Sequence, residues 1–236
     1  RDSIMSDYTP ITLNMSEDEI IAAEVLTTII DNTVSMSGVS KMATFLSIGH
    51  NINRLTESIR KNVSNYHNTF HQPLKATYWE EVLHNSFLDI DFTTTWRPNE
   101  SHRVGEDMRI VDLESSRISC KSGQIINNSM IEYSGSRTTR HRTLEDKIDF
   151  LATIHHDYHF MLAKNKPFNG IYRLLIIKEE MSNVGDLDWR SCGDNYISVG
   201  GPFEAKIIHN MSDQLWVKLP LERVEHDILI DVRHLL

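Results

Sequence analysis

The sequence has 236 residues, of which 40% are hydrophobic and 24% are charged, and its formal net charge is −9. This length suits one large domain, or a domain with a small appendage. The negative charge argues against a protein that coats nucleic acid, although a local basic cleft is still allowed. Two distant cysteines make no disulfide framework, so we expect a cytoplasmic protein. No apolar run approaches the roughly 18 residues of a membrane span, and no membrane association is expected.

The first third of the chain is predicted to be helical. Residues 16–19 match the capping-box pattern, and the apolar spacing that follows predicts a helix over about 20–32. Residues 40–72 have the same spacing, with a break near Gly49, and Pro73 ends the run. We expect residues 1–75 to form a helical subdomain that builds a dimer interface or holds DNA. Residues 76–236 would form an α/β core, continuous with it in one domain.

A second capping box, Thr77 to Glu80, predicts a helix that continues to about Leu88. Its apolar face is formed by Trp79, Val82, Leu83 and Phe87. At 100° per residue Glu80 lies at the edge of this face, whereas Glu81 points away from it. Glu80 is therefore the acid that we expect to face a site, although its place in the capping box also explains it as a helix cap.

A β-hairpin is predicted over residues 105–123, after a strand at 90–96 and a turn at 98–101. Its first strand has the apolar residues Met108, Ile110 and Val111, and its turn lies at residues 113–116. In its second strand Ile118 and Cys120 alternate with Ser119 and Lys121, the period of a half-buried strand. Such a turn brings Asp107 close to Lys121. A carboxylate and a lysine at one end of a hairpin are the minimum parts for holding a divalent cation against a phosphate.

Positive charge is concentrated directly after this hairpin. Residues 121–142 contain four lysines and arginines but only one acid, Glu132. Arg137, Arg140 and Arg142 lie within six residues, and arginine is the usual bidentate partner of guanine and of phosphate. These arginines, with Ser136 and Thr139 between them, are candidate DNA contacts. The alternative is a solvated surface run.

The remaining elements complete an α/β order. A capping box at residues 143–146 predicts a helix. Further strands are predicted at residues 158–163, 172–177, 196–199, 206–209 and 215–219, with a strand or helix at 227–232 and mostly loop at 181–203. The histidines near residue 155 suggest a metal cluster, but we expect them to open a strand, with His155 and His156 exposed. A small-molecule hydrolase that uses this strand would lack a nucleophile motif, and a match to the HNH nuclease pattern near Gly49 is fainter still.

Three pieces of the chain carry a resemblance to the PD-(D/E)xK nuclease superfamily, in particular to type II restriction endonucleases. They are Asp107 before an apolar strand, Lys121 in the segment 118–123, and the helix and strands of residues 144–177. The resemblance covers about residues 77–180. It implies a mixed central β-sheet flanked by helices, with Mg²⁺ held by Asp107 and by the backbone carbonyl of Cys120. Lys121 would lie beside the attacking water and the phosphate.

Ser119 departs from the family, because an acid usually stands two residues before the lysine. Some restriction enzymes with a non-acid at this position recruit a carboxylate from a helix. Glu80 and Glu132 are the candidates for this second carboxylate. Asp112 could replace Asp107 if the hairpin register were shifted.

The sequence therefore predicts a Mg²⁺-dependent type II restriction endonuclease. It would hydrolyse phosphodiester bonds of double-stranded DNA at a specific short sequence, as a homodimer on a palindromic duplex. A structure-specific repair nuclease of the same fold is one alternative. A catalytically silent DNA-binding protein is another, and Ser119 favours it.

Overall fold

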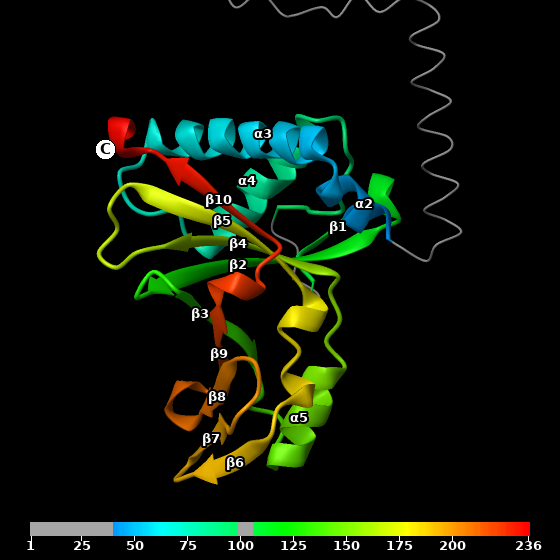
Figure 1. Ribbon diagram of the computed structural model, residues 1–236, viewed down its shortest axis with the longest axis vertical. Coiled ribbons are helices and arrows are strands. Elements are labelled where there is room, and N and C mark those ends of the chain that lie inside the picture. Colours follow the sequence, from blue (N-terminus) through cyan, green and yellow to red (C-terminus); the bar gives the residue numbers. More distant parts are fainter. Residues whose placement is uncertain (1–39, 99–105) are drawn as a thin grey trace, which may run out of the picture.

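The computed structural model describes residues 40–98 and 106–236 as a mixed α/β structure built on one large sheet (Figure 1). The helix expected at 20–32 and its capping box lie outside the described residues, as does most of the turn expected at 98–101. Within the described ranges, no helix combines the length and the apolar character needed to cross a membrane.

The helices follow most of the sequence signals. Their bounds are Lys41–Ser47 for α2, Gly49–His67 for α3, Ala76–Leu88 for α4 and Leu144–Ala152 for α5. The predicted break before Gly49 is confirmed, because Ile48 is extended between α2 and α3. The capping box at α5 is also confirmed, since the Thr143 side chain accepts from the Asp146 amide. The predicted box at Thr77 is wrong: the N-cap of α4 is Lys75, two residues earlier, and its side chain makes no cap hydrogen bond.

The sheet is mixed, as predicted. Its strands are Met108–Ile110 (β1), Ser116–Ile126 (β2), Met130–Arg137 (β3), Tyr158–Lys164 (β4), Ile171–Lys178 (β5), Trp189–Cys192 (β6), Asn195–Ser198 (β7), Glu204–Ile208 (β8), Gln214–Pro220 (β9) and His226–Asp231 (β10). The order is β10-β5-β4-β2-β3-β9-β8-β7-β6, and β1 pairs with β2 off this path. β2 and β4 are parallel, and the other pairs are antiparallel. The chain between β2 and β4 contains β3 and α5.

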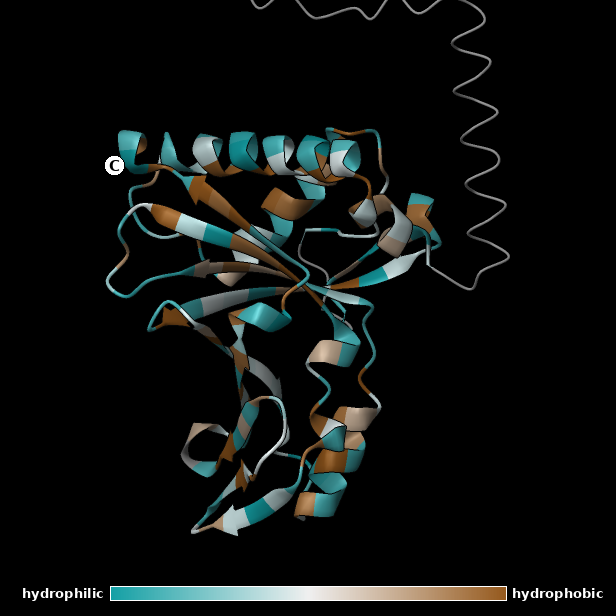
Figure 2. Cartoon of the chain, viewed as in Figure 1, coloured by the Kyte–Doolittle hydropathy of each residue, from teal (hydrophilic) through white to brown (hydrophobic). Residues whose placement is uncertain are grey.

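Alternate residues of β4 divide the interior into two cores. Phe160 and Leu162 face α2, α3 and α4, whereas Met161 and Ala163 face the side that carries α5. Figure 1 shows α3 and α4 above the upper part of the sheet and α5 beside its lower part. Apolar residues gather on the upper strands, and the outer side of α3 is largely hydrophilic (Figure 2). The described helices of the predicted N-terminal subdomain thus share a core with the sheet.

Three strand predictions need correction. Residues 90–96 form no strand: only Thr94 bridges to Ile110, and Asp91 has a positive φ of 67° that turns the chain. Strand β3 was not predicted, because its inward residues are few and Glu132 and its polar neighbours occupy the other face. The sequence predicts loop at the position of β6, because its residues are largely exposed and only its pairing with β7 defines it as a strand.

Candidate active site

The predicted hairpin is present and leaves a gap along β2. Met108 pairs with Ile118, and the Asp107 amide donates to the Ile118 carbonyl at 2.8 Å. β3 joins the same side of β2 only from Gly123 onward. Among the described strands, none therefore pairs with this side of residues 119–122. The gap gives a ligand access to backbone groups in the middle of the sheet.

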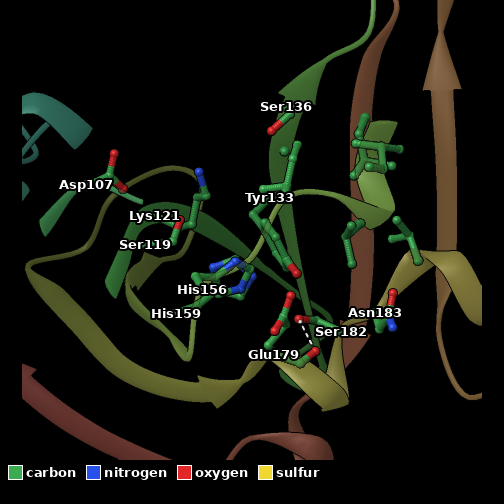
Figure 3. Close-up of a pocket in the computed structure, with 16 residues that line it drawn as sticks. Asp107, Ser119, Lys121, Tyr133, Ser136, His156, His159, Glu179, Ser182 and Asn183 are labelled. Carbon is green, nitrogen blue, oxygen red and sulfur yellow. Dashed lines mark hydrogen bonds between the residues drawn. The ribbon is translucent and has the colours of Figure 1, made fainter. Parts of the chain in front are cut away.

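Asp107 and Lys121 converge at this gap. Both side chains are half-buried, and both line one pocket with Ser119 (Figure 3). The pocket has a cavity volume of about 110 Å³. The Cys120 amide donates to Asp107 Oδ2 at 2.5 Å. Because the amide and carbonyl of one strand residue point to the same side, the Cys120 carbonyl also faces the gap.

Glu80 lies on the helix side of the same region. It is 8% exposed on α4, whose residues pack with the core that contains Cys120. Burial raises the pKa of the Cys120 thiol, and the charges of Asp107 and Glu80 raise that pKa further. Both carboxylates are therefore close to Cys120, although Glu80 does not line the pocket of Asp107.

The other two predicted acids lie elsewhere. Glu132 makes an ion pair with Lys206 at 3.5 Å and does not line the pocket of Asp107. It lines two other pockets, both of which Trp216 also lines. Asp112 accepts a hydrogen bond from the Thr93 amide at 2.5 Å. The hairpin register is thus the unshifted one, with Asp107 at its open end.

Two buried histidines complete the pocket, and their role was missed from the sequence. His156 and His159 are only 8% and 6% exposed, and their ring centroids are 3.8 Å apart. His159 pairs with Ser119 in the parallel register of β2 and β4. The prediction that His156 is exposed is wrong, because the turn before β4 folds it into the pocket. His155 is exposed as predicted and pairs with Glu179 at 3.5 Å.

The histidine rings are uncharged near neutral pH. Burial lowers the pKa of His156 to about 4, with a further contribution from the charge of Lys121. Burial, His156 and Lys121 lower the pKa of His159 as well. A neutral imidazole has one donor and one acceptor nitrogen. Both nitrogens of His156 and Nδ1 of His159 are buried without a hydrogen-bond partner in the part of the chain that the structure describes.

The donor set at the gap has the chemistry that Mg²⁺ requires. In residues 40–98 and 106–236, no three His, Cys, Asp or Glu side chains are grouped to hold a metal ion. The gap instead presents the Asp107 carboxylate and the Cys120 carbonyl, with Glu80 nearby. Mg²⁺ is usually held by one or two carboxylates, and waters and substrate phosphates complete its shell. These residues therefore fit an ion that binds together with a phosphate, not a closed structural site.

The arginine segment starts at the pocket and is firmly anchored. Ser136 lines the pocket, whereas Arg137, Arg140 and Arg142 are exposed. The hydroxyls of Thr138 and Thr139 donate to the carbonyls of Asp213 and Ser212, each at 2.7 Å. Lys147 Nζ donates from beneath to the carbonyls of Thr138 and His141. The arginines thus project from a fixed backbone, and the Thr139 hydroxyl is already engaged within the protein.

A scan of protein-family models and searches of curated proteins and of solved structures found no match to this chain.

Proposed function

We propose that this chain is a Mg²⁺-dependent deoxyribonuclease of the type II restriction class, with a restriction endonuclease-like core. It cuts double-stranded DNA at a specific short sequence, as a cytoplasmic homodimer. The observation that carries the proposal is the convergence of Asp107 and Lys121 on one pocket at an unpaired edge of β2.

Each residue at the gap has a definite role in this proposal. Asp107, the Cys120 carbonyl and Glu80 hold the ion, and the Cys120 amide fixes the orientation of Asp107. When bound there, Mg²⁺ would supply a water of lowered pKa and positive charge for the phosphate. The Lys121 ammonium lies beside the scissile phosphate, where it neutralises developing charge and orients the attacking water.

Glu80 is the better candidate for the second carboxylate. Its charge acts on Cys120 together with that of Asp107, whereas Glu132 is paired with Lys206 away from the pocket. Ser119 carries no charge at the position where the family usually has an acid, so the Glu80 carboxylate from α4 coordinates the ion in place of that acid. In this proposal Asp107 contributes its carboxylate from the pocket, and Glu80 contributes its carboxylate from α4.

DNA contact is assigned to the segment from Ser136 to Arg142. Its exposed guanidinium groups suit phosphate and guanine, and the anchored backbone gives them a fixed starting position. A homodimer would present two such segments, which matches the two-fold symmetry of a palindromic site.

Plasmid digestion with mapping of the cut ends tests the proposal. We expect discrete cuts in Mg²⁺ and none in EDTA. Lys121→Met should lower the cleavage rate by at least about 100-fold, the usual cost of losing one group that stabilises a transition state. Lys164→Met is the matched control and should retain the rate, because Lys164 lies on the adjacent strand β4 and lines another pocket.

A second pair of variants tests the source of the carboxylate. Glu80→Gln should lose most of the cleavage rate, and Glu132→Gln should keep it. Equal rates for Glu80→Gln and the wild type would remove Glu80 from the site. Cuts distributed without sequence preference would favour the structure-specific nuclease.

The serine at position 119 and the absence of a three-ligand metal group among the described residues favour one other candidate, a catalytically silent DNA-binding protein. Calorimetric titration with Mg²⁺ and Mn²⁺, with and without duplex DNA, separates the two. Duplex binding without any metal affinity would support the silent protein.

A further inference from the structure

The pocket of Asp107 and Lys121 continues into a space between β3, β9 and α5 that the hydrolytic roles leave unused (Figure 3). Leu151, Val184, Leu215 and Val217 form the apolar part of its walls. His156, His159, Tyr133 and Glu179 supply polar groups to the same space. An apolar pocket with a few convergent polar groups is the usual form of a small-molecule site.

We propose that this space binds one unstacked nucleobase of the strand being cut, recognised by the adjoining imidazoles of His156 and His159. This inference rests on the proposed nuclease function, because it assigns the nucleotide next to the phosphate held by Lys121. It adds a recognition site to the chemistry at the gap.

The two histidines offer unpaired polar groups to a ligand. Three of their ring nitrogens are buried without a partner among the residues that the structure describes. Leaving a buried donor or acceptor unsatisfied costs about 1–3 kcal/mol. Each neutral ring offers a donor and an acceptor, and the edge of a nucleobase offers both in one plane. A base therefore satisfies these groups in a way that a purely apolar ligand cannot.

The surrounding charges argue against other occupants. A second phosphate would meet the Glu179 carboxylate and the acceptor nitrogens of neutral imidazoles, which repel an anion. A resident cation at the histidines would lie near the ammonium of Lys121, whose charge already acts on both rings. In the described ranges these histidines also belong to no three-ligand group.

Ring stacking supplies the remaining affinity. The His156 and His159 rings adjoin each other, and Tyr133 meets His159 edge to face with centroids 5.6 Å apart. Stacking of a base on such rings contributes about 1–3 kcal/mol. A base inside a duplex cannot enter a pocket of this kind, so the nucleotide must leave the stack before it binds.

Nuclear magnetic resonance of the imidazole nitrogens tests the inference on the full chain without metal. The protein is titrated with each of the four deoxynucleoside 5′-monophosphates, and with deoxyribose 5-phosphate as the base-free control. We expect saturable shifts of the His156 and His159 signals with at least one nucleotide and none with the control. Equal shifts with deoxyribose 5-phosphate, or no shift with any nucleotide, would overturn the proposal.

A matched pair of variants measures the contribution of the ring. His156→Leu removes the polar groups and should weaken nucleotide binding by about tenfold, the equivalent of one hydrogen bond. His156→Gln keeps a donor and an acceptor and should bind within a factor of about three of the wild type. Similar affinities for the two variants would contradict recognition by hydrogen bonding.

The outcome is separable from that of the proposed function. Base-dependent shifts in a protein that does not cut DNA would support the base-binding pocket and contradict the nuclease function. Cleavage that depends on Asp107, together with imidazole shifts that do not depend on the base, would support the nuclease function and contradict the base-binding pocket.

Discussion

Lys147 is the residue whose loss should most disturb the arginine segment. Its side chain is only 4% exposed, and Nζ pairs with Asp213 Oδ2 at 3.0 Å. The same ammonium donates to the Thr138 carbonyl at 3.1 Å and to the His141 carbonyl. Lys147→Met keeps the apolar stem and removes all three contacts. It leaves a largely buried carboxylate and two carbonyls without this donor.

The expected loss of unfolding free energy is about 3 kcal/mol. Removing one partner of a buried ion pair costs about 3–5 kcal/mol. The lower end applies here because Asp213 keeps His209 at 2.7 Å as a second partner. For a chain of this size each kcal/mol shifts the melting temperature by about 2–4 °C, so a fall of about 6–12 °C is expected.

Differential scanning calorimetry and urea unfolding measure this loss. Lys206→Met is the matched control, because the Lys206 side chain is 45% exposed and pairs with Glu132 at 3.5 Å. Such an exposed pair contributes no more than about 1 kcal/mol. A loss for Lys147→Met that does not exceed the loss for the control would refute the reasoning about the buried ammonium.

Three further predictions concern the thiols, the histidines and the arginines. Cys120 should resist alkylation in the folded protein while Cys192 reacts, because Cys120 is buried with a raised thiol pKa and Cys192 is exposed; mass spectrometry that finds both modified at equal rates would contradict this. The pKa of His156 is lowered from 6.5 to about 4, so the unfolded state takes up its proton first as the pH falls. The stability from the neutral ring is therefore complete above about pH 6.5 and is lost toward pH 4, at about 1.4 kcal/mol per unit of pKa shift. His156→Leu should flatten this part of the curve of unfolding free energy against pH, and an unchanged slope would show that the ring does not titrate this way. Arg140→Ala should reduce the slope of log affinity for duplex DNA against log salt concentration by about 1; an unchanged slope in fluorescence anisotropy would remove Arg140 from the DNA contacts.

Local signals in the sequence were sufficient for the hairpin and the central strands. Alternation in residues 118–121 and polar residues in the turn gave the pairing of β1 with β2. Continuous apolar runs gave β4 and β5, which are buried on both faces. The Thr143 capping box gave the start of α5. In each case the residues that decide the structure are neighbours in the chain.

The features that could not be predicted from the sequence, strand β3 and the buried histidines, depend on contacts between residues that are distant in the chain. Strand β3 exists through its pairing with β2 and β9, and its outer face is polar. The burial of His156 and His159 depends on the parallel register of β4 with β2, which sets His159 beside Ser119. If β3 had been predicted, Glu132 would have been expected to face away from the side chain of Tyr133, because neighbouring residues of a strand face opposite sides.

The rate of DNA cleavage by Asp107→Asn tests the central claim most directly. Asparagine keeps the shape of the side chain and an oxygen that accepts from the Cys120 amide, so the hairpin should stay intact while the carboxylate charge is lost. The account predicts Mg²⁺-dependent cleavage at discrete sites by the wild type and a rate at least about 100-fold lower in the variant, with duplex binding retained. Equal cleavage by both proteins, or no cleavage by the wild type on any duplex, would contradict it.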